Sequence, residues 1–303
     1  MNAPLPASDP RATTVDAALA AARAAGVARL DAQLLLAAAL DCPRTWLLGH
    51  GDALLAPAVA GRFDAAWRRR AAGEPLAYLT GRREFRGLLL AVTPAVLVPR
   101  PETEHLVDWG LELLETALSD RRAPRVADLG TGSGAIALAL AAAWPAAGVV
   151  AVERSEAALA VARGNGRALG IPVDWRSGDW WHALAGDDGF DLVLSNPPYV
   201  AAGDPHLAAL AHEPLSALVA GVDGLDALRT IVAGAPPRLA AGAWLLLEHG
   251  HDQGAAVRAL LEARGFDRVS TRADLAGLPR CSGGRWPGPT NERPGPDGVQ
   301  NGR

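Results

Sequence analysis

The four residues Asn196-Pro197-Pro198-Tyr199 are the part of this sequence whose side chains indicate the most definite chemistry. They follow an apolar run, residues 190–194, that predicts a strand buried inside a parallel sheet. The two prolines lack a backbone N–H, so they end the strand and stiffen the chain beyond it. Ligands of open α/β sheets bind at this carboxyl edge. Asn196 is therefore expected to face a binding site.

The groups offered by this stretch match a planar NH2 group. The side-chain oxygen of Asn196 and the backbone carbonyl of Pro197 accept hydrogen bonds, and together they can take both hydrogens of an amide or of an exocyclic amine. The ring of Tyr199 can pack against the flat group so held. A strand followed by a proline-rich surface turn would explain the same four residues, so the rest of the chain has to decide.

A glycine-rich loop, residues 130–134, lies between a predicted strand over 125–129 and a predicted helix over 135–143. Its glycines let the backbone pass close to a ligand, and the N-terminus of the following helix favours negative charge. The spacing Gly130-x-Gly132-x-x-Ala135 also satisfies the relaxed dinucleotide pattern, which keeps a nicotinamide or flavin enzyme open.

The acids near the predicted strand ends favour S-adenosylmethionine over a dinucleotide. Asp128 precedes the loop, and an acid there suits a cationic ligand better than a pyrophosphate. Glu153 ends the next predicted strand and can accept both hydroxyls of a ribose. Asp179 can accept from an adenine amino group while Trp180 covers the ring. With the loop 130–134 lining the methionine part, these groups match S-adenosylmethionine one by one.

The remaining sequence divides into two folded regions and two ends. Residues 13–81 predict a small helical bundle, and residues 82–100 a β-hairpin that links it to the domain over residues 101–286. In that domain strands alternate with helices, which predicts an α/β fold with a doubly wound sheet. We expect residues 1–12 and 287–303 to be disordered.

Arg100, between two prolines in the linker, is hard to explain as helix capping and is a candidate for a position over the site.

Helices are expected over residues 15–25, 30–40, 57–71, 101–118, 135–143, 155–169, 225–239 and 253–264, and strands over 125–129, 149–152, 173–175, 190–194, 243–248 and 266–271.

Composition excludes several other classes of protein. The formal net charge of -4 over 303 residues does not favour a nucleic-acid binder. No charge-free apolar stretch approaches the roughly 18 residues of a membrane span, and the N-terminus lacks a secretory signal, so we expect a cytoplasmic protein. The two cysteines, Cys42 and Cys281, are too few for a disulfide framework or a metal cluster.

In their order along the chain, these motifs resemble class I S-adenosylmethionine-dependent methyltransferases that act on a planar nitrogen. Residues 98–104 and 247–250 narrow the resemblance to the bacterial protein-glutamine N5-methyltransferases of the PrmC/HemK family, which modify peptide chain release factors. The likeness runs from about residue 13 to 275 and includes residues 74–81. It departs at residues 278–286, which do not read as the last strand usual in the family.

The resemblance implies a Rossmann-like sheet, S-adenosylmethionine as methyl donor, and methylation of the glutamine in the Gly-Gly-Gln motif of class-1 release factors, with the helical bundle helping to dock that protein. Asn196 and Pro197 would hold the substrate amide, with Pro198 beside them and Tyr199 packed on it. No general base stands out, and His249 is expected to be structural. The implied cofactor-binding set is Asp128, Gly130, Thr131, Gly132, Ser133, Gly134, Glu153, Asp179, Trp180 and Asn196.

Three alternatives stay open at this point. A DNA adenine-N6 methyltransferase could use the same Asn-Pro-Pro-Tyr site on a flipped base, although the acidic balance and the lack of an evident DNA-recognition insertion argue against it. A dehydrogenase would leave that site idle. A non-enzymatic module that binds the ribosome or a release factor would have no use for the implied cofactor-binding and substrate-binding residues.

Overall fold

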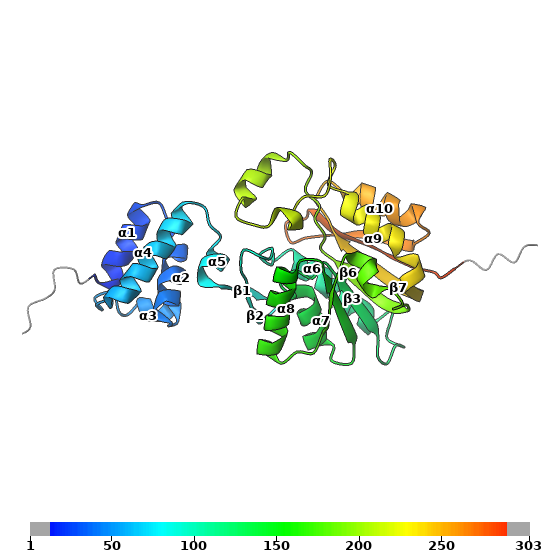
Figure 1. The fold of residues 1–303 in the computed structure, drawn as a ribbon, viewed down its shortest axis with the longest axis horizontal. Helices are drawn as coiled ribbons and strands as arrows, with labels where there is room; N and C mark the ends of the chain where they lie inside the picture. Colours follow the sequence, from blue (N-terminus) through cyan, green and yellow to red (C-terminus); the bar gives the residue numbers. More distant parts are fainter. Residues whose placement is uncertain (1–12, 290–303) are drawn as a thin grey trace, which may run out of the picture.

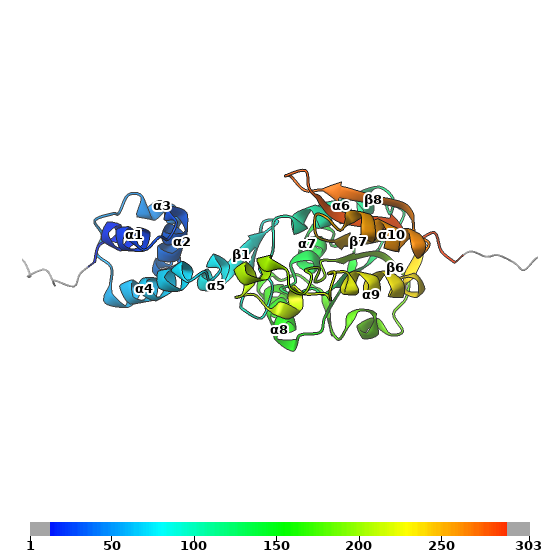
Figure 2. The same ribbon diagram turned by 90° about the horizontal axis from the view of Figure 1, so that it is seen from above.

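The computed structural model describes residues 13–289. A helical bundle lies at one end of the molecule and an α/β domain at the other, with a short helix and a hairpin between them (Figures 1 and 2). The predicted disorder of residues 1–12, and that of the tail from residue 290 on, falls outside the described residues.

The bundle contains the three predicted helices, α1 (Val15–Ala24), α2 (Arg29–Leu40) and α4 (Pro57–Ala71). Thr14 caps α1 through a hydrogen bond from the backbone N–H of Ala17. Two short helices, α3 (Arg44–Leu47) and α5 (Leu76–Thr80), were not predicted, because one turn of helix carries no apolar period that can be recognised.

The described chain of the second domain forms a sheet of seven strands in the order β5-β4-β3-β6-β7-β9-β8. Strands β3, β4, β5, β6 and β7 are parallel to one another. From β3 the chain adds β4 and β5 on one side of the sheet and then β6 and β7 on the other, so the strand order reverses between β3 and β6. The strands are β3 (Arg125–Leu129), β4 (Gly148–Glu153), β5 (Asp174–Ser177), β6 (Phe190–Ser195), β7 (Leu239–Glu248), β8 (Asp267–Ala273) and β9 (Pro279–Arg285).

Helices cover both faces of the sheet, as predicted for a doubly wound fold. Alternate strand residues point to opposite faces: Val126 packs in the core beneath α6 and α7, whereas Ala127 packs in the core beneath α9 and α10. The helices are α6 (Thr103–Glu115), α7 (Ala135–Ala143), α8 (Glu156–Leu169), α9 (Asp226–Gly234) and α10 (Gly254–Ala263).

Strand β9 corrects the sequence analysis, which assigned no strand to residues 278–286. It lies between β7 and β8 and is antiparallel to both. Its central residues, 281–284, have small side chains or none, so they show no apolar pattern. Close packing requires the two glycines among them. A Cβ at Gly283 would lie 2.4 Å from Leu246 Cδ2, and one at Gly284 would lie 3.0 Å from Phe266 Cβ.

The region around residue 236 also differs from the prediction. Helix α9 ends at Gly234 and not near residue 239, because Pro236 and Pro237 cannot continue it. Strand β7 therefore begins at Leu239, four residues earlier than expected.

The predicted linker hairpin is present as β1 (Arg82–Phe85) and β2 (Leu88–Ala91), and Asn165 of α8 fastens it to the α/β domain. The Asn165 side chain accepts from the Ala91 N–H at 2.8 Å and donates to the Ala91 carbonyl at 3.0 Å. It also donates to the carbonyl of Ser133 in the glycine loop at 2.9 Å. One buried side chain thus holds the hairpin against the loop.

Replacing Asn165 with Ala should lower the free energy of unfolding by about 3 kcal/mol, because three backbone groups lose their partner. Urea denaturation followed by circular dichroism measures this. Arg167→Ala, on the exposed side of the same helix, serves as the control and should change stability by less than about 0.5 kcal/mol. Equal effects of the two substitutions would contradict the fastening role of Asn165.

Candidate functional site

Two cavities lie side by side at the carboxyl edge of the sheet, beyond the ends of β3 and β6. The first has a volume of about 380 Å³ and the second of about 340 Å³. Residues lining both are Leu97, Arg100, Asn196 and Ala217. The two cavities therefore share a wall, and Asn196 is part of it.

The glycine loop forms one wall of the first cavity through Gly130, Thr131, Gly132 and Ser133. Gly130 has φ +76°, and a Cβ there would lie 3.0 Å from Cζ3 of the Trp180 ring. A side chain at position 130 would therefore push Trp180 out of its place.

Asp128 and Gly134, which the sequence analysis assigned to the same ligand, do not line the first cavity. Asp128 is fully buried beneath the loop, where its carboxyl accepts from the Thr131 hydroxyl at 2.6 Å and from the Ala137 N–H at 3.2 Å. Burial raises the pKa of Asp128 to about 7. Asp128 therefore supports the glycine loop from beneath through these two hydrogen bonds.

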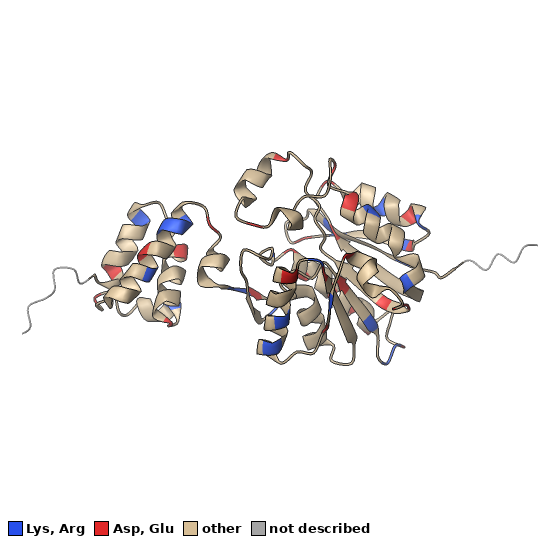
Figure 3. Cartoon of the chain, in the orientation of Figure 1, with Lys and Arg blue, Asp and Glu red and all other residues tan. Residues whose placement is uncertain are grey.

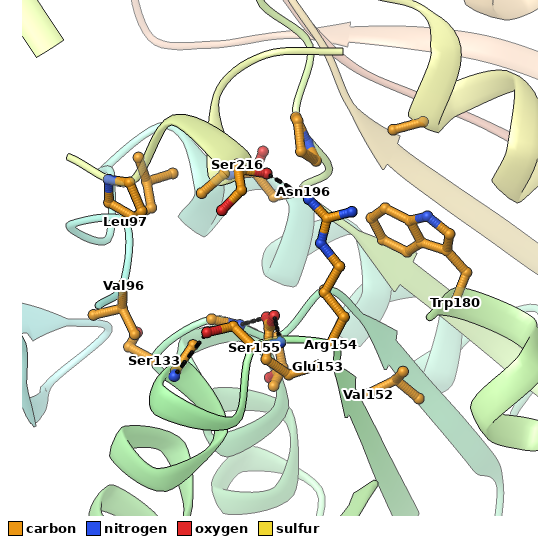
Figure 4. A pocket seen from close by; sticks show the side chains of 18 of the residues that line it. Val96, Leu97, Ser133, Val152, Glu153, Arg154, Ser155, Trp180, Asn196 and Ser216 are labelled. Atoms are coloured by element: carbon orange, nitrogen blue, oxygen red, sulfur yellow. Dashed lines mark hydrogen bonds between the residues drawn. The ribbon is translucent and has the colours of Figure 1, made fainter. Parts of the chain in front are cut away.

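Glu153, at the end of β4, and Trp180 face the first cavity from other sides (Figure 4). The Glu153 carboxylate accepts from the Gly132 N–H at 3.0 Å and from the Ser155 N–H at 2.9 Å, which fixes its position. Trp180 has φ +42°, a left-handed conformation that is costly for a residue with a large side chain. Asp179 lines the cavity beside it and is exposed.

The Asn-Pro-Pro-Tyr stretch divides between the cavities. Asn196 lines both, Pro198 the first, and Tyr199 the second, whereas Pro197 is buried and lines neither. The Nδ2 of Asn196 donates to the hydroxyl of Thr103 at 3.0 Å. Sequence reasoning placed these residues at a strand end, and the structure has them there.

The spacing between the glycine loop and Asn196 is fixed by a hydrogen bond between strand ends. The Ser195 hydroxyl, at the end of β6, donates to the carbonyl of Leu129, at the end of β3, at 2.6 Å. Both residues are fully buried. The loop and Asn196 are therefore held together as one unit.

Three residues were missed as site residues: Thr103, which lines the first cavity, and Glu248 and Arg280, which line the second. Glu248 ends β7, lines the cavity, and accepts from the Tyr199 hydroxyl at 3.2 Å. Burial raises the pKa of Glu248 to about 7. An acid at the end of a predicted strand, the feature that identified Glu153, would have identified Glu248 too.

Arg100 lines both cavities, as the sequence analysis anticipated. Its guanidinium pairs with Glu213, whose other carboxyl oxygen accepts from the Val98 N–H at 3.1 Å. Glu213 belongs to the segment between β6 and α9, residues 200–225. Figure 4 shows Arg154, the residue after β4, directed toward the carbonyl of Ser216 in the same segment. This segment therefore covers the cavities.

His249 is structural, as expected. It is fully buried and lines neither cavity. Its Nδ1 donates to the Gly250 carbonyl at 2.8 Å, so its Nε2 accepts from the Ser282 hydroxyl at 2.8 Å. Burial lowers the pKa of the ring, which keeps it neutral.

Arg and acidic residues are interspersed over both domains in the view of Figure 3. Within residues 13–289 there is no group of His, Cys, Asp or Glu side chains that could hold a metal ion. No helix among these residues is long and apolar enough to cross a membrane.

Comparison with known families assigns both domains. Residues 14–81 match the family model described as "PrmC N-terminal domain", and residues 103–216 match "Methyltransferase small domain". Among solved structures, the delta-N METTL16 MTase domain is similar with a TM-score of 0.51 at 18% identity, covering 66% of this chain and 89% of that one. A likeness at that identity concerns the fold.

Curated relatives are much more similar. The release factor glutamine methyltransferase of Xylella fastidiosa (strain Temecula1) is 53% identical over 274 residues, covering 89% of this chain and 98% of the relative. The Burkholderia pseudomallei protein of that name is 52% identical, covering 88% and 95%. The one from Pseudomonas aeruginosa is 48% identical, covering 86% and 93%. This chain belongs to the release factor glutamine methyltransferase family.

Proposed function

We propose that this protein transfers a methyl group from S-adenosylmethionine to the side-chain amide nitrogen, N5, of the glutamine in the Gly-Gly-Gln motif of class-1 peptide chain release factors. The observation that carries the proposal is the meeting of two cavities at Asn196. One cavity suits a nucleoside, and the other suits a flat amide.

The first cavity fits the methyl donor. Glu153 is held at one wall by two backbone N–H groups, with carboxylate lone pairs left over for ribose hydroxyls. Gly130 leaves room for the Trp180 ring, which can cover an adenine. S-adenosylmethionine supplies an electrophilic methyl group when bound. Gly130 to Ser133 would hold its methionine part, Glu153 its ribose, and Asp179 with Trp180 its adenine.

The second cavity fits the glutamine side chain. An amide nitrogen is a poor nucleophile because its lone pair is delocalised into the carbonyl, so the protein has to orient it. The side-chain oxygen of Asn196, which lines both cavities, would accept an amide hydrogen, which directs the nitrogen lone pair toward the first cavity and stabilises positive charge on nitrogen. The Tyr199 ring would pack on the amide plane.

The family assignment favours this function over the alternatives. A dehydrogenase would not use the second cavity, and a DNA methyltransferase is not what the relatives are named for. Because the substrate is a translation factor, we place the reaction in the cytoplasm and propose no direct nucleic-acid partner.

The proposal is tested by incubating the protein with S-adenosylmethionine and a purified class-1 release factor, followed by peptide mass spectrometry. One methyl group on the glutamine of Gly-Gly-Gln is the expected result. The control is a release factor with that glutamine changed to Glu, which should stay unmodified. Methyl transfer to duplex DNA in a parallel reaction, with none to the release factor, would contradict the proposal.

Replacing Asn196 with Ala should reduce methyl transfer below detection, because the amide loses its orienting acceptor, while the Kd for S-adenosylmethionine stays within about tenfold. Isothermal titration and a radiolabelled methyl assay measure the two quantities. If donor binding and transfer fell together by the same factor, the assigned role of Asn196 would be wrong.

Replacing Trp180 with Ala should weaken S-adenosylmethionine binding by about tenfold to a hundredfold, because stacking of an aromatic ring on a base contributes about 1–3 kcal/mol. Trp180→Phe is the matched control and should keep most of the affinity. Isothermal titration of both variants checks this. If Trp180→Ala bound S-adenosylmethionine with wild-type affinity, the adenine would not stack on Trp180 and this assignment would be wrong.

A further inference from the structure

The place of Tyr199 at the second cavity is set by hydrogen bonds at both ends of the residue. At the end of the side chain, its hydroxyl donates to Oε1 of Glu248 at 3.2 Å. At the backbone, its carbonyl accepts from Nε2 of Gln253 at 3.0 Å. Glu248 is the last residue of β7, and Gln253 immediately precedes α10. The turn between β7 and α10 therefore supplies the partners of Tyr199 at both ends.

The side chain of Gln253 joins three segments of backbone. Its Nε2 donates to the Tyr199 carbonyl and, at 3.3 Å, to the carbonyl of Asp223, near the end of the segment that covers the cavities. Its Oε1 accepts from the Gly250 N–H at 2.8 Å. Because a backbone carbonyl can only accept and a backbone N–H can only donate, the amide of Gln253 can lie only this way round.

The surroundings leave this contact little freedom. The Gln253 N–H donates back to the Gly250 carbonyl at 2.9 Å, and Nδ1 of the buried His249 donates to the same carbonyl at 2.8 Å. On the other side lies Gly224, where a Cβ would collide with the Tyr199 carbonyl oxygen and lie 2.8 Å from Nε2 of Gln253. The position of the Tyr199 backbone therefore depends on the side chain of Gln253.

We infer that Gln253 is a positioning residue for the methyl transfer: its side-chain amide, held by the turn after β7, fixes the backbone of Tyr199 and joins it to the covering segment. Gln253 itself lines neither cavity. The inference rests on the proposed function, which packs the ring of Tyr199 on the substrate amide. It also gives a use to residues 247–250, since Glu248 holds the hydroxyl of the ring and the turn that follows holds Gln253.

The first test replaces Gln253 with Met, which removes the three side-chain hydrogen bonds at similar volume. At saturating S-adenosylmethionine, kcat for a class-1 release factor should fall by about tenfold to a hundredfold, since misplacing a positioning group has effects of that size. The Kd for S-adenosylmethionine should stay within about threefold, because Glu213 still ties the covering segment to Arg100. Arg258→Met is the matched control: it removes a 2.7 Å hydrogen bond from α10 to Thr271, lines neither cavity, and should keep wild-type kcat.

Gln253→Glu gives a readout that poor folding would not produce. A carboxylate has no hydrogen to donate and would face two carbonyl oxygens, which raises its pKa. Once protonated, the same group can again donate to the Tyr199 carbonyl and accept from the Gly250 N–H. The kcat of Gln253→Glu, divided by that of wild type at each pH, should therefore rise as the pH is lowered. The same ratio for Gln253→Met should stay constant.

The other charged groups near Gln253 are shared by wild type and variants. Asp223 is paired with Arg229, which lowers the pKa of Asp223 to about 2, so it stays ionised. His251 and Asp252 precede Gln253 in every variant. Dividing by the wild-type kcat at each pH removes what these groups contribute. Circular dichroism at each pH identifies any condition in which a variant is unfolded.

The outcomes separate this inference from the proposed function. Wild-type protein that leaves the glutamine unmethylated would remove the function itself. If wild type methylates it and Gln253→Met stays within about threefold of its kcat, the positioning role is overturned and the function stands. A loss in Gln253→Glu that low pH does not lessen, or an equal loss in Arg258→Met, would also overturn the positioning role.

Discussion

Strands β3 and β6 pair in parallel, with Asp128 opposite Leu194 at the carboxyl end. They are far apart in the sequence, and their pairing places the glycine loop after one strand beside Asn196 after the other. The buried hydrogen bond from Ser195 to the Leu129 carbonyl, 2.6 Å long, fixes that junction. The order in which the chain adds strands to the sheet reverses between β3 and β6, and open α/β sheets bind ligands at such a point. Both cavities and their shared wall at Asn196 follow from this one pairing.

The remaining walls come from segments outside the sheet, and each is fastened by a buried polar contact. The Tyr78 hydroxyl of α5 donates to the Val96 carbonyl at 2.6 Å, and Val96 lines the first cavity. Glu213 links the covering segment to the linker through Arg100 and Val98. The helical bundle is thus connected to the cavity wall through α5 and the linker. A partner that binds the bundle and places a side chain in the second cavity would contact parts of one continuous structure.

Much of the fold was predictable because its elements carry local patterns. Apolar runs identified the parallel strands, and Ser155 marked the start of α8. Strand β9 was not predictable from a local pattern: Gly283 and Gly284 are there because neighbouring backbone and side chains leave no room for a Cβ. That constraint comes from packing, which a single sequence does not display.

The site shows the same division between local and tertiary information. The positions of Asn196 and Glu153 at strand ends follow from strand prediction. The contact of Asn196 with Thr103 joins residues 93 positions apart, and nothing in the sequence pairs them. For Asp128 the sequence suggested a contact that the structure does not have. An acid at this position suited a cationic ligand, but its carboxyl accepts hydrogen bonds from Thr131 and Ala137 beneath the loop.

The central claim is that the methyl donor and the substrate amide occupy separate cavities and meet at Asn196. A crystal structure of the protein with S-adenosylhomocysteine and a peptide containing Gly-Gly-Gln tests it most directly. We expect the adenosyl group to lie between Glu153 and Trp180, and the glutamine amide to lie within hydrogen-bond distance of Asn196 Oδ1, beside Tyr199. A glutamine bound outside the second cavity, or an Asn196 whose nitrogen faces the amide, would contradict it.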